Sequence, residues 1–459
     1  MGSWQWGGDC CISGLLRRKN QEILPLRRWP GMLGPFPKRG ACCRDRKLEA
    51  WAKILVWLSC WLGLLMVWGA PAWSAGFALV QQGTAAMGQG NAFVAEASDS
   101  SAIYYNPAGL NQLKRFEVYS GTIFNYPDRE YHGFPPSETE SRLLYTGAVY
   151  VAGPVTNRVA LGLGLFSPFG LSSKWPDTWA GRYISTFSRL RTYNVNPVVS
   201  VKVLDNLSLA AGVNMLWSAP ELKRNIPTPL GDGDVSLAAD GMGMGYNLGA
   251  LYEPVSGVKL GVHFRSQISV VHRGDLTLRL PPPLLAPSIR GSAKIAFPPS
   301  VTFGAAYSRI KPFTFLFDVT WTGWSTFDQL KVDLETPLAG AFSLVTPKDW
   351  RDAWAFRFGV NYEIKPGLKV RAGYIYDMTP VPNHTFDPQL ADANRHVFTI
   401  GKEFTYKRFT FGAAYNYILF ENRTKNNVIA VNGVPAPLQA NGPYASDSHS
   451  LGVSAAVKF

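Results

Sequence analysis

The chain has few cysteines, and none of them lies beyond residue 60. The five are Cys10, Cys11, Cys42, Cys43 and Cys60. The rest of the chain therefore carries no disulfide framework and no thiol chemistry. Adjacent cysteines also lack the intervening residues that zinc ligands need, so we expect no metal site. No cofactor is expected either.

Motifs of common enzymes are missing as well. The sequence has no G-x-S-x-G nucleophile elbow, which an esterase of the cell envelope would be expected to show. The stretch Gly88–Phe93 has two of the glycines of a nucleotide-binding loop but lacks the third small residue and a preceding strand. We therefore expect no catalytic residues and no enzyme.

The chain also lacks an apolar run long enough for an ordinary spanning helix. The longest run, Ile54 to Gly69, has sixteen residues, whereas a spanning helix needs roughly 20. Basic residues precede the run and small residues follow it, which predicts a signal peptide at 47–74 with cleavage before Ala75. The alternative cleavage site is Ala70-Pro71-Ala72. Residues 1–46 form a basic extension to which we assign no fold.

The basic charge belongs largely to this front part. The whole chain has 45 Lys and Arg, 32 Asp and Glu, and a net charge of +13. Residues 1–74 hold eleven of the basic and four of the acidic residues, which leaves 34 and 28 and a net charge of +6. Nucleic-acid binding thus loses its main support, and we expect no nucleic-acid partner.

Residues 116–459 show repeated alternation of apolar with small or polar residues. In the stretch 313–321, for example, Phe and other large apolar residues occupy every second position, and Asp318 lies on the opposite face. A period of two indicates strands with one apolar face. A soluble sandwich and a membrane barrel both produce this pattern, so the connections must distinguish them.

Short and long connections alternate strictly. Six short joints lie at Gly153–Asn157, Leu204–Asn206, Glu253–Gly257, Ser308–Pro312, Glu363–Gly367 and Thr405–Arg408. Seven longer stretches lie near 127–141, 167–189, 218–242, 280–291, 323–350, 378–394 and 420–447. This pattern predicts an all-β fold, a transmembrane 14-stranded antiparallel β-barrel of the outer membrane, with short periplasmic turns and long extracellular loops.

Aromatic residues make up 13% of the chain, which suits interfacial girdles at the ends of membrane strands. The girdle candidates are Tyr145, Trp217, Trp321, Trp324, Trp350 and Trp354. The same alternation points several cations into the lumen, where an arginine could hold a carboxylate through paired N–H donors. These candidate ligand-binding residues are Arg357, Arg371, Lys369, His263 and Arg265. The alternative is that each is ion-paired inside the lumen, for instance to Asp318.

A barrel of this size leaves a lumen that its own side chains cannot fill. The glycine-rich residues 75–115 precede the first strand and suit a compact insert. Pro107 disfavours helix at Asn106, so the chain must turn there. A flexible periplasmic tail is the alternative for this segment.

The segment resembles the N-terminal hatch of the FadL family of outer-membrane channels, through Ala75-Gly76-Phe77 and Asn106-Pro107-Ala108. The C-terminal residue, Phe459, also fits this resemblance. Further similar stretches are Trp175–Tyr183, Asn196-Pro197, Gly243–Gly249, Asp318–Ser325, Arg371–Asp377, Pro380–Pro382 and Asp392–His396. The resemblance covers essentially all of residues 75–459. It implies a plug at 75–115 inside a barrel at 116–459, with Phe77, Asn106, Pro107 and Ala108 as gate residues.

The resemblance also implies a function, namely passive uptake of hydrophobic molecules, for which we expect long-chain fatty acids. Capture would be extracellular, the hatch would move, and release would be lateral, through a wall opening made by a kinked strand. Pro197 and Pro298-Pro299 are both candidates for that bend. Uptake of aromatic hydrocarbons and a general porin for polar solutes are the alternatives. The implied partners are the ligand, outer-membrane lipid and the barrel-assembly machinery, which would act through Phe459, and the implied state is a monomer.

Overall fold

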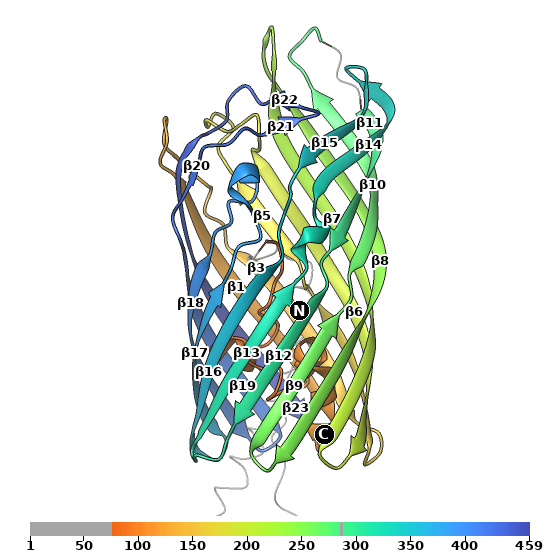
Figure 1. The fold of residues 1–459 in the computed structure, drawn as a ribbon, viewed down its shortest axis with the longest axis vertical. Coiled ribbons are helices and arrows are strands. Elements are labelled where there is room, and N and C mark those ends of the chain that lie inside the picture. Colours follow the sequence, from red (N-terminus) through yellow and green to blue (C-terminus); the bar gives the residue numbers. More distant parts are fainter. Residues whose placement is uncertain (1–75, 285–287) are drawn as a thin grey trace, which may run out of the picture. The chain divides into compact units, whose positions relative to one another are not determined.

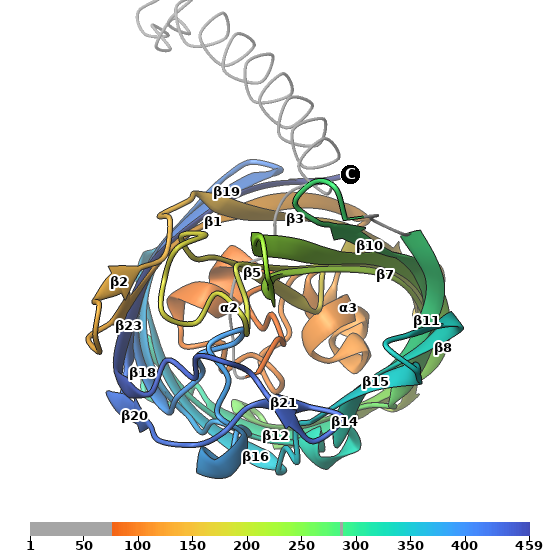
Figure 2. The ribbon, with the colours of Figure 1, turned by 90° about the horizontal axis from the view of Figure 1, so that it is seen from above.

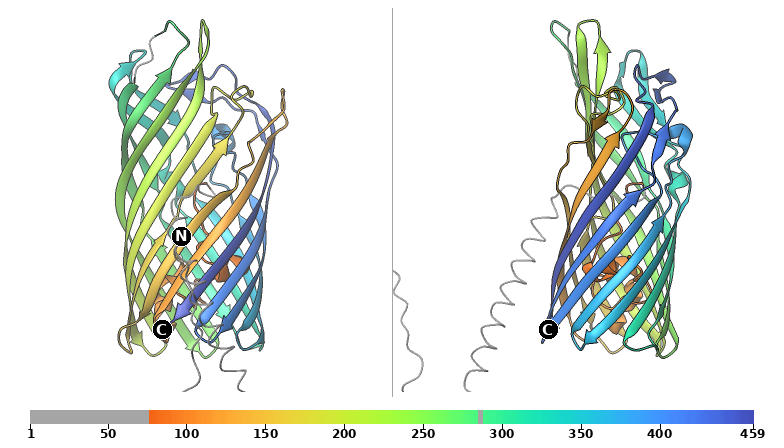
Figure 3. Two further views of the ribbon diagram at one scale, coloured as in Figure 1. Left: turned by 180° about the vertical axis from the view of Figure 1, so that it is seen from behind. Right: turned by 90° about the vertical axis from the view of Figure 1, so that its left-hand side faces the viewer.

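The structure, a computed structural model, describes residues 76–284 and 288–459. The predicted signal peptide, its cleavage site and the basic extension at 1–46 lie outside the described residues. No helix among the described residues is both long and apolar enough to cross a membrane. The described chain is dominated by tilted antiparallel strands (Figures 1 and 3).

The strands close into a barrel of fourteen wall strands. Nine of these run without interruption: β1 (Glu117–Tyr131), β3 (Leu144–Pro154), β6 (Phe187–Leu204), β7 (Leu207–Thr228), β8 (Gly231–Val255), β17 (Leu368–Asp377), β18 (Arg395–Tyr406), β19 (Phe409–Phe420) and β23 (Gly442–Lys458). The first and last wall strands, β1 and β23, pair antiparallel from Glu117↔Lys458 to Tyr131↔Tyr444. This closure leaves no open sheet edge, as a sheet in lipid requires.

The other five wall strands are each interrupted once. Their halves are β4 (Val159–Phe166) with β5 (Gly170–Lys174), β9 (Val258–Arg265) with β10 (Ile268–Arg279), β12 (Ser300–Tyr307) with β11 (Ser288–Phe297), β13 (Phe313–Thr322) with β14 (Gln329–Leu338), and β16 (Ala353–Lys365) with β15 (Ala341–Pro347). Short elements in the loops are β2 (Ser137–Glu138), β20 (Arg423–Lys425), β21 (Ala430–Val431), β22 (Val434–Pro435), η2 (Trp324–Thr326) and η3 (Asn383–Thr385).

The predicted fold is confirmed. All six short joints fall between consecutive wall strands at one end of the barrel, which we call the turn end, and the long connections lie at the opposite, loop end (Figure 1). The outward faces in the middle of the wall are apolar, with Phe303, Phe398 and Ile400 each at least half exposed. An apolar outer face is what contact with lipid demands.

Two sequence expectations need correction. Residues 218–242 and 323–350 are not loops, because β7 with β8 and β14 with β15 continue as hairpins whose turns lie between Thr228 and Gly231 and between Leu338 and Ala341. Trp324 and Trp350 do not belong to an interfacial girdle, because their side chains are buried in the barrel core. Both lie at interruptions of wall strands, where the backbone leaves the alternating ladder and the rings turn inward.

Residues 76–115, here called the inner segment, lie inside the ring of strands (Figure 2). They form α2 (Thr84–Gly88), α3 (Ala102–Tyr105) and the 3-10 turn η1 (Pro107–Gln112), joined by irregular chain. Their backbone approaches the wall closely at inward-facing glycines. A Cβ at Gly373 of β17 would lie 2.3 Å from the carbonyl carbon of Gln89, and one at Gly261 of β9 would lie 2.4 Å from the oxygen of Val94. At these two positions the backbone of the inner segment lies so close to the wall that no side chain would fit between them.

Candidate functional site

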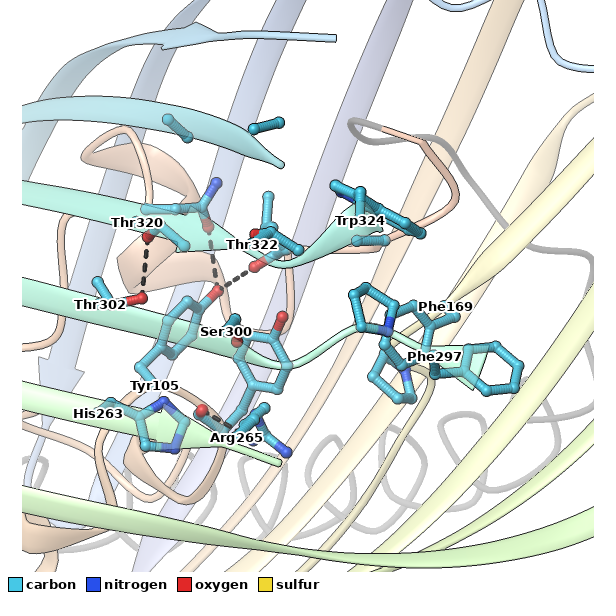
Figure 4. A pocket seen from close by; sticks show the side chains of 18 of the residues that line it. Tyr105, Phe169, His263, Arg265, Phe297, Ser300, Thr302, Thr320, Thr322 and Trp324 are labelled. Atoms are coloured by element: carbon cyan, nitrogen blue, oxygen red, sulfur yellow. Dashed lines mark hydrogen bonds between the residues drawn. The ribbon is translucent and has the colours of Figure 1, made fainter. Parts of the chain in front are cut away.

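A pocket of about 110 Å³ lies between the inner segment and the wall. It has a polar end and an aromatic end (Figure 4). Tyr105, His263 and Arg265 lie at the polar end, whereas Phe169, Phe297 and Trp324 form the aromatic end. We call this cavity the inner pocket. A molecule with one polar group and an apolar body matches this division.

Arg265 is positioned by contacts on several sides. Its Nη1 donates to Asn214 Oδ1 at 2.8 Å, and its Nη2 donates to the Tyr104 carbonyl at 2.9 Å. The guanidinium carbon lies 4.6 Å from the centre of the Tyr104 ring and 5.4 Å from that of Phe166. Within the described part of the chain, no carboxylate forms an ion pair with Arg265.

Arg357, on β16, also lines the inner pocket and donates from Nη1 to the hydroxyl of Thr320. The carboxylate of Asp318 is used elsewhere, because its Oδ2 accepts the backbone N–H groups of Phe93 at 2.8 Å and Val94 at 3.0 Å. Among the described residues Arg357 likewise has no ion pair. Neither guanidinium group forms an ion pair with a described residue, although Asp318 lies directly opposite Arg357 in the β13–β16 pairing and Asp377, which is ion-paired to Arg395, also lines the cavity.

The structure brings three of the five predicted ligand-binding residues together. His263, Arg265 and Arg357 all line the inner pocket. Arg371 also points inward and is buried, but its Nη2 pairs with Glu403 at 2.9 Å. Lys369 is only partly buried, two residues closer to the turn end on β17, and does not line the pocket.

The predicted gate residue Phe77 is buried at the centre of an aromatic cluster. Its ring centroid lies 4.6 Å from that of Trp324, and further neighbours are Phe327, Trp350, Phe297 and Phe169 at 5.5, 5.5, 5.8 and 6.1 Å. The preceding residue, Gly76, donates its N–H to Asp392 Oδ2 at 3.1 Å. Asp392 lies in the loop between β17 and β18, and burial raises its pKa above the ordinary value.

The other predicted gate residues are fixed by hydrogen bonds. Asn106 Nδ2 donates to the carbonyls of Val94 at 2.8 Å and Ala250 at 2.9 Å. Its Oδ1 accepts the N–H of Ala108 at 3.2 Å, which caps the start of η1 at Pro107. Asn106 thereby ties two parts of the inner segment to strand β8.

A second cavity, of about 150 Å³, lies between wall strands at the loop end of the barrel and is here called the loop groove. Its walls are largely aliphatic and include Val235, Leu237, Leu276, Leu278, Val332, Leu338 and Leu344. Leu330 lines the groove and also packs against the aromatic cluster around Phe77. The aromatic cluster also includes Trp324 and Phe297, which line the inner pocket. The cluster therefore separates the two cavities.

The barrel wall is broken between β4 and β5. Here Pro168 and Phe169 leave the ladder with β6 and pair with the inner segment instead, since Leu79 N–H donates to the Pro168 carbonyl and Gly170 N–H to the Phe77 carbonyl, each at 2.8 Å. Of the two proline sites considered from the sequence, Pro298-Pro299 separates β11 from β12, whereas Pro197 lies within β6.

Sequence reasoning missed the break at Pro168 and the bond from Gly76 to Asp392. The signal for the first was available, because Ser167-Pro168 interrupts the alternation of 159–166. Residues 167 and 168 instead fall within the predicted long connection 167–189. The second joins residues 316 positions apart, and no local pattern announces such a contact.

Comparisons of the sequence and of the structure with known proteins point to the same family. The sequence model of one family, described as outer membrane protein transport protein (OMPP1/FadL/TodX), matches residues 65–459. A long-chain fatty acid transport protein of Shigella flexneri is 22% identical, over 73% of this chain and 86% of that protein. A solved FadL homologue of Pseudomonas aeruginosa has a TM-score of 0.75 at 21% identity, covering 84% of this chain and 100% of that one. A solved toluene transporter, TodX of Pseudomonas putida, has a TM-score of 0.66 at 16% identity, covering 84% and 100%.

Proposed function

This chain belongs to the OMPP1/FadL/TodX family of outer membrane transport proteins, and from that premise we propose that it takes up long-chain fatty acids by passive diffusion. Transport of hydrophobic compounds at the outer membrane follows from the family. The fatty acid, the residues that bind it and the route are our proposals. They rest mainly on one observation, namely that two guanidinium groups, those of Arg265 and Arg357, line the inner pocket without forming an ion pair.

Capture starts in the loop groove. Its aliphatic walls lie at the loop end, which faces the cell exterior in outer-membrane barrels. Transfer of an acyl chain from water into such a groove gains about 0.8 kcal/mol per buried CH₂ group. Passage to the inner pocket requires the aromatic cluster to open, because Phe77 and its neighbours lie between the two cavities.

In the inner pocket the carboxylate of the fatty acid pairs with Arg265 and Arg357, and the acyl chain packs against Phe169, Phe297 and Trp324. A buried cation without a counter-ion is costly. A fatty acid supplies the missing charge, whereas a hydrocarbon does not. This difference favours the fatty acid over the aromatic hydrocarbon as the ligand.

Release takes place laterally, through the wall break between β4 and β5. The break is closed by backbone hydrogen bonds to Phe77 and Leu79. Movement of the inner segment removes these bonds and opens a path from the pocket into the bilayer. We assign the inner segment the role of hatch. Of its gate residues, Phe77 moves, whereas Asn106, Pro107 and Ala108 hold the other end of the segment in place.

Ligand binding to the purified full-length protein in lipid nanodiscs tests the proposal. Oleate and oleyl alcohol share one chain and differ in charge. We expect oleate to bind more tightly, and Arg265→Gln and Arg357→Gln each to weaken oleate binding about 10- to 100-fold, since a charge-assisted hydrogen bond contributes about 1.5–3 kcal/mol. Oleyl alcohol should be affected little. Lys369→Gln is the matched control, because Lys369 lies outside the pocket.

Equal binding of both compounds to all variants would rule out carboxylate recognition. Toluene that binds competitively with oleate, and more tightly, would indicate a hydrocarbon channel instead. A density map of the protein extracted in mild detergent should show an acyl chain in the inner pocket. A general porin predicts a water-filled pocket and a conductance that deletion of residues 76–115 leaves unchanged.

A further inference from the structure

The outer surface of the wall carries a group of cations at the loop end of β5, β6 and β7. We propose that this group binds the phosphate groups of a phosphorylated glycolipid in the outer leaflet. The four residues on the strands are Lys174, Arg189, Arg191 and Lys223, and we call them the basic wall patch. The proposal is independent of the transported ligand.

The strand register places these side chains on the outside. On β6, Arg189 and Arg191 alternate with Ser188, Leu190 and Thr192, which are buried toward the lumen. Residues directly opposite each other in an antiparallel pair share a face of the sheet. Lys174 of β5 lies opposite Phe187, and so does Lys223 of β7. All four cations therefore project from one surface.

The patch lies at headgroup height. Tyr193, two residues below Arg191 on the same face, stacks on Trp217 with ring centroids 5.3 Å apart, as in an interfacial girdle. Toward the turn end the outward positions of β6 become apolar, with Val195, Val199 and Val201 exposed. A lipid whose acyl chains cover these valines places its headgroup against the patch.

Charges within the patch are not balanced. Glu221 pairs with Arg189 at 2.5 Å and Lys223 at 3.4 Å, and Glu140 pairs with Lys174 at 2.5 Å and Arg142 at 2.6 Å. Arg142 and three residues of the patch thus share two carboxylates, and together with Arg191 this leaves three positive charges in excess. Arg191 makes no ion pair or hydrogen bond with the described residues.

A neighbouring sector of the wall differs. On β10, the outward Arg273 lies opposite Asp240, and Asp275 lies opposite Arg290. In these two pairs each positive charge lies opposite a negative one, so the four residues carry no excess of either sign. The excess is therefore not general around the rim. Guanidinium groups bind phosphate oxygens with paired N–H donors, and the outer leaflet presents phosphate at this height as a glycolipid headgroup.

Native mass spectrometry of the full-length protein with defined lipids tests the proposal. We expect diphosphorylated lipid A to bind more tightly than its dephosphorylated form. The double variant Arg189→Gln/Arg191→Gln should lose at least tenfold in lipid A affinity. The single variant Arg191→Gln should lose at least threefold, and it breaks no internal ion pair. Arg273→Gln, the matched control, should bind as the natural protein does.

Three results would overturn the proposal: equal affinity for lipid A with and without phosphate, equal affinity of the natural protein and the Arg191→Gln variant, or displacement of lipid A by millimolar inorganic phosphate, which would make free phosphate the ligand. Retained heat-modifiability on gels and unchanged oleate binding establish that each variant is folded. These readouts also keep the test separate from the uptake proposal, because the patch lies outside the lumen.

Discussion

Replacement of Phe77 by alanine should loosen the first residues of the inner segment without opening the barrel. The side chain is 5% exposed and contacts five other aromatic rings. Removal of a buried phenylalanine typically costs about 3–5 kcal/mol. Since about 1.4 kcal/mol corresponds to a factor of ten, opening of this end should become about 100- to 4,000-fold more frequent. The wall strands keep all their ladder bonds.

Hydrogen exchange in nanodiscs measures this opening directly, because two amides report on it. The N–H of Leu79 donates to the Pro168 carbonyl, and the N–H of Gly170 donates to the Phe77 carbonyl. Both should exchange faster by the factor given above. Phe303→Ala is the control, since Phe303 is 54% exposed on the outer face. Unchanged protection of both amides in the Phe77 variant would refute the role of Phe77 as the anchor.

Three further changes probe other parts of the molecule. Gly373→Val should push the backbone at Gln89 away from the wall and raise single-channel conductance; an unchanged conductance would show that the close contact seals nothing. Asp318→Asn removes the charge that two backbone N–H groups share, so exchange at Phe93 should rise about fivefold, for a loss of about 1 kcal/mol; equal exchange would contradict this anchor. Leu276→Asp in the loop groove should slow oleate capture at least tenfold, as measured by stopped-flow mixing, and should leave equilibrium binding in the inner pocket unchanged. An unchanged rate of capture would show that the groove is not part of the route.

Much of the fold could be predicted from the sequence, because lipid imposes a simple rule on it. Outward positions within the hydrocarbon layer must be apolar and every sheet edge must be paired, so alternation and turn length together define the strands. Alternation also gives the side on which a residue lies. Arg265, Arg357 and Arg371 are all inward, as expected.

Alternation does not give the position of a residue along the barrel axis. That position depends on the stagger between strands, which the sequence does not state. Arg357 therefore reaches the inner pocket, while Arg371 on the adjacent strand pairs with Glu403. Alternation is equally uninformative where a strand is interrupted. Trp324 and Trp350 lie at such places, and for that reason their inward direction was missed.

The two ends of the inner segment are held by different kinds of contact, and this difference indicates which end a hydrophobic ligand can move. Asn106 is held by hydrogen bonds to the carbonyls of Val94 and Ala250. A hydrocarbon chain offers no substitute for these bonds, and each buried group left unpaired would cost about 1–3 kcal/mol. The side chain of Phe77 is held by aromatic packing, and an acyl chain entering the cluster replaces one apolar contact with another, so that only the backbone hydrogen bonds to Pro168 and Gly170 have to be broken. We therefore expect the ligand to displace Phe77 and the first residues after it, while Asn106 stays fixed. An Asn106→Ala variant should lower the thermal stability of the inner segment and leave the rate of oleate entry unchanged, whereas a faster entry would place the moving end at Asn106.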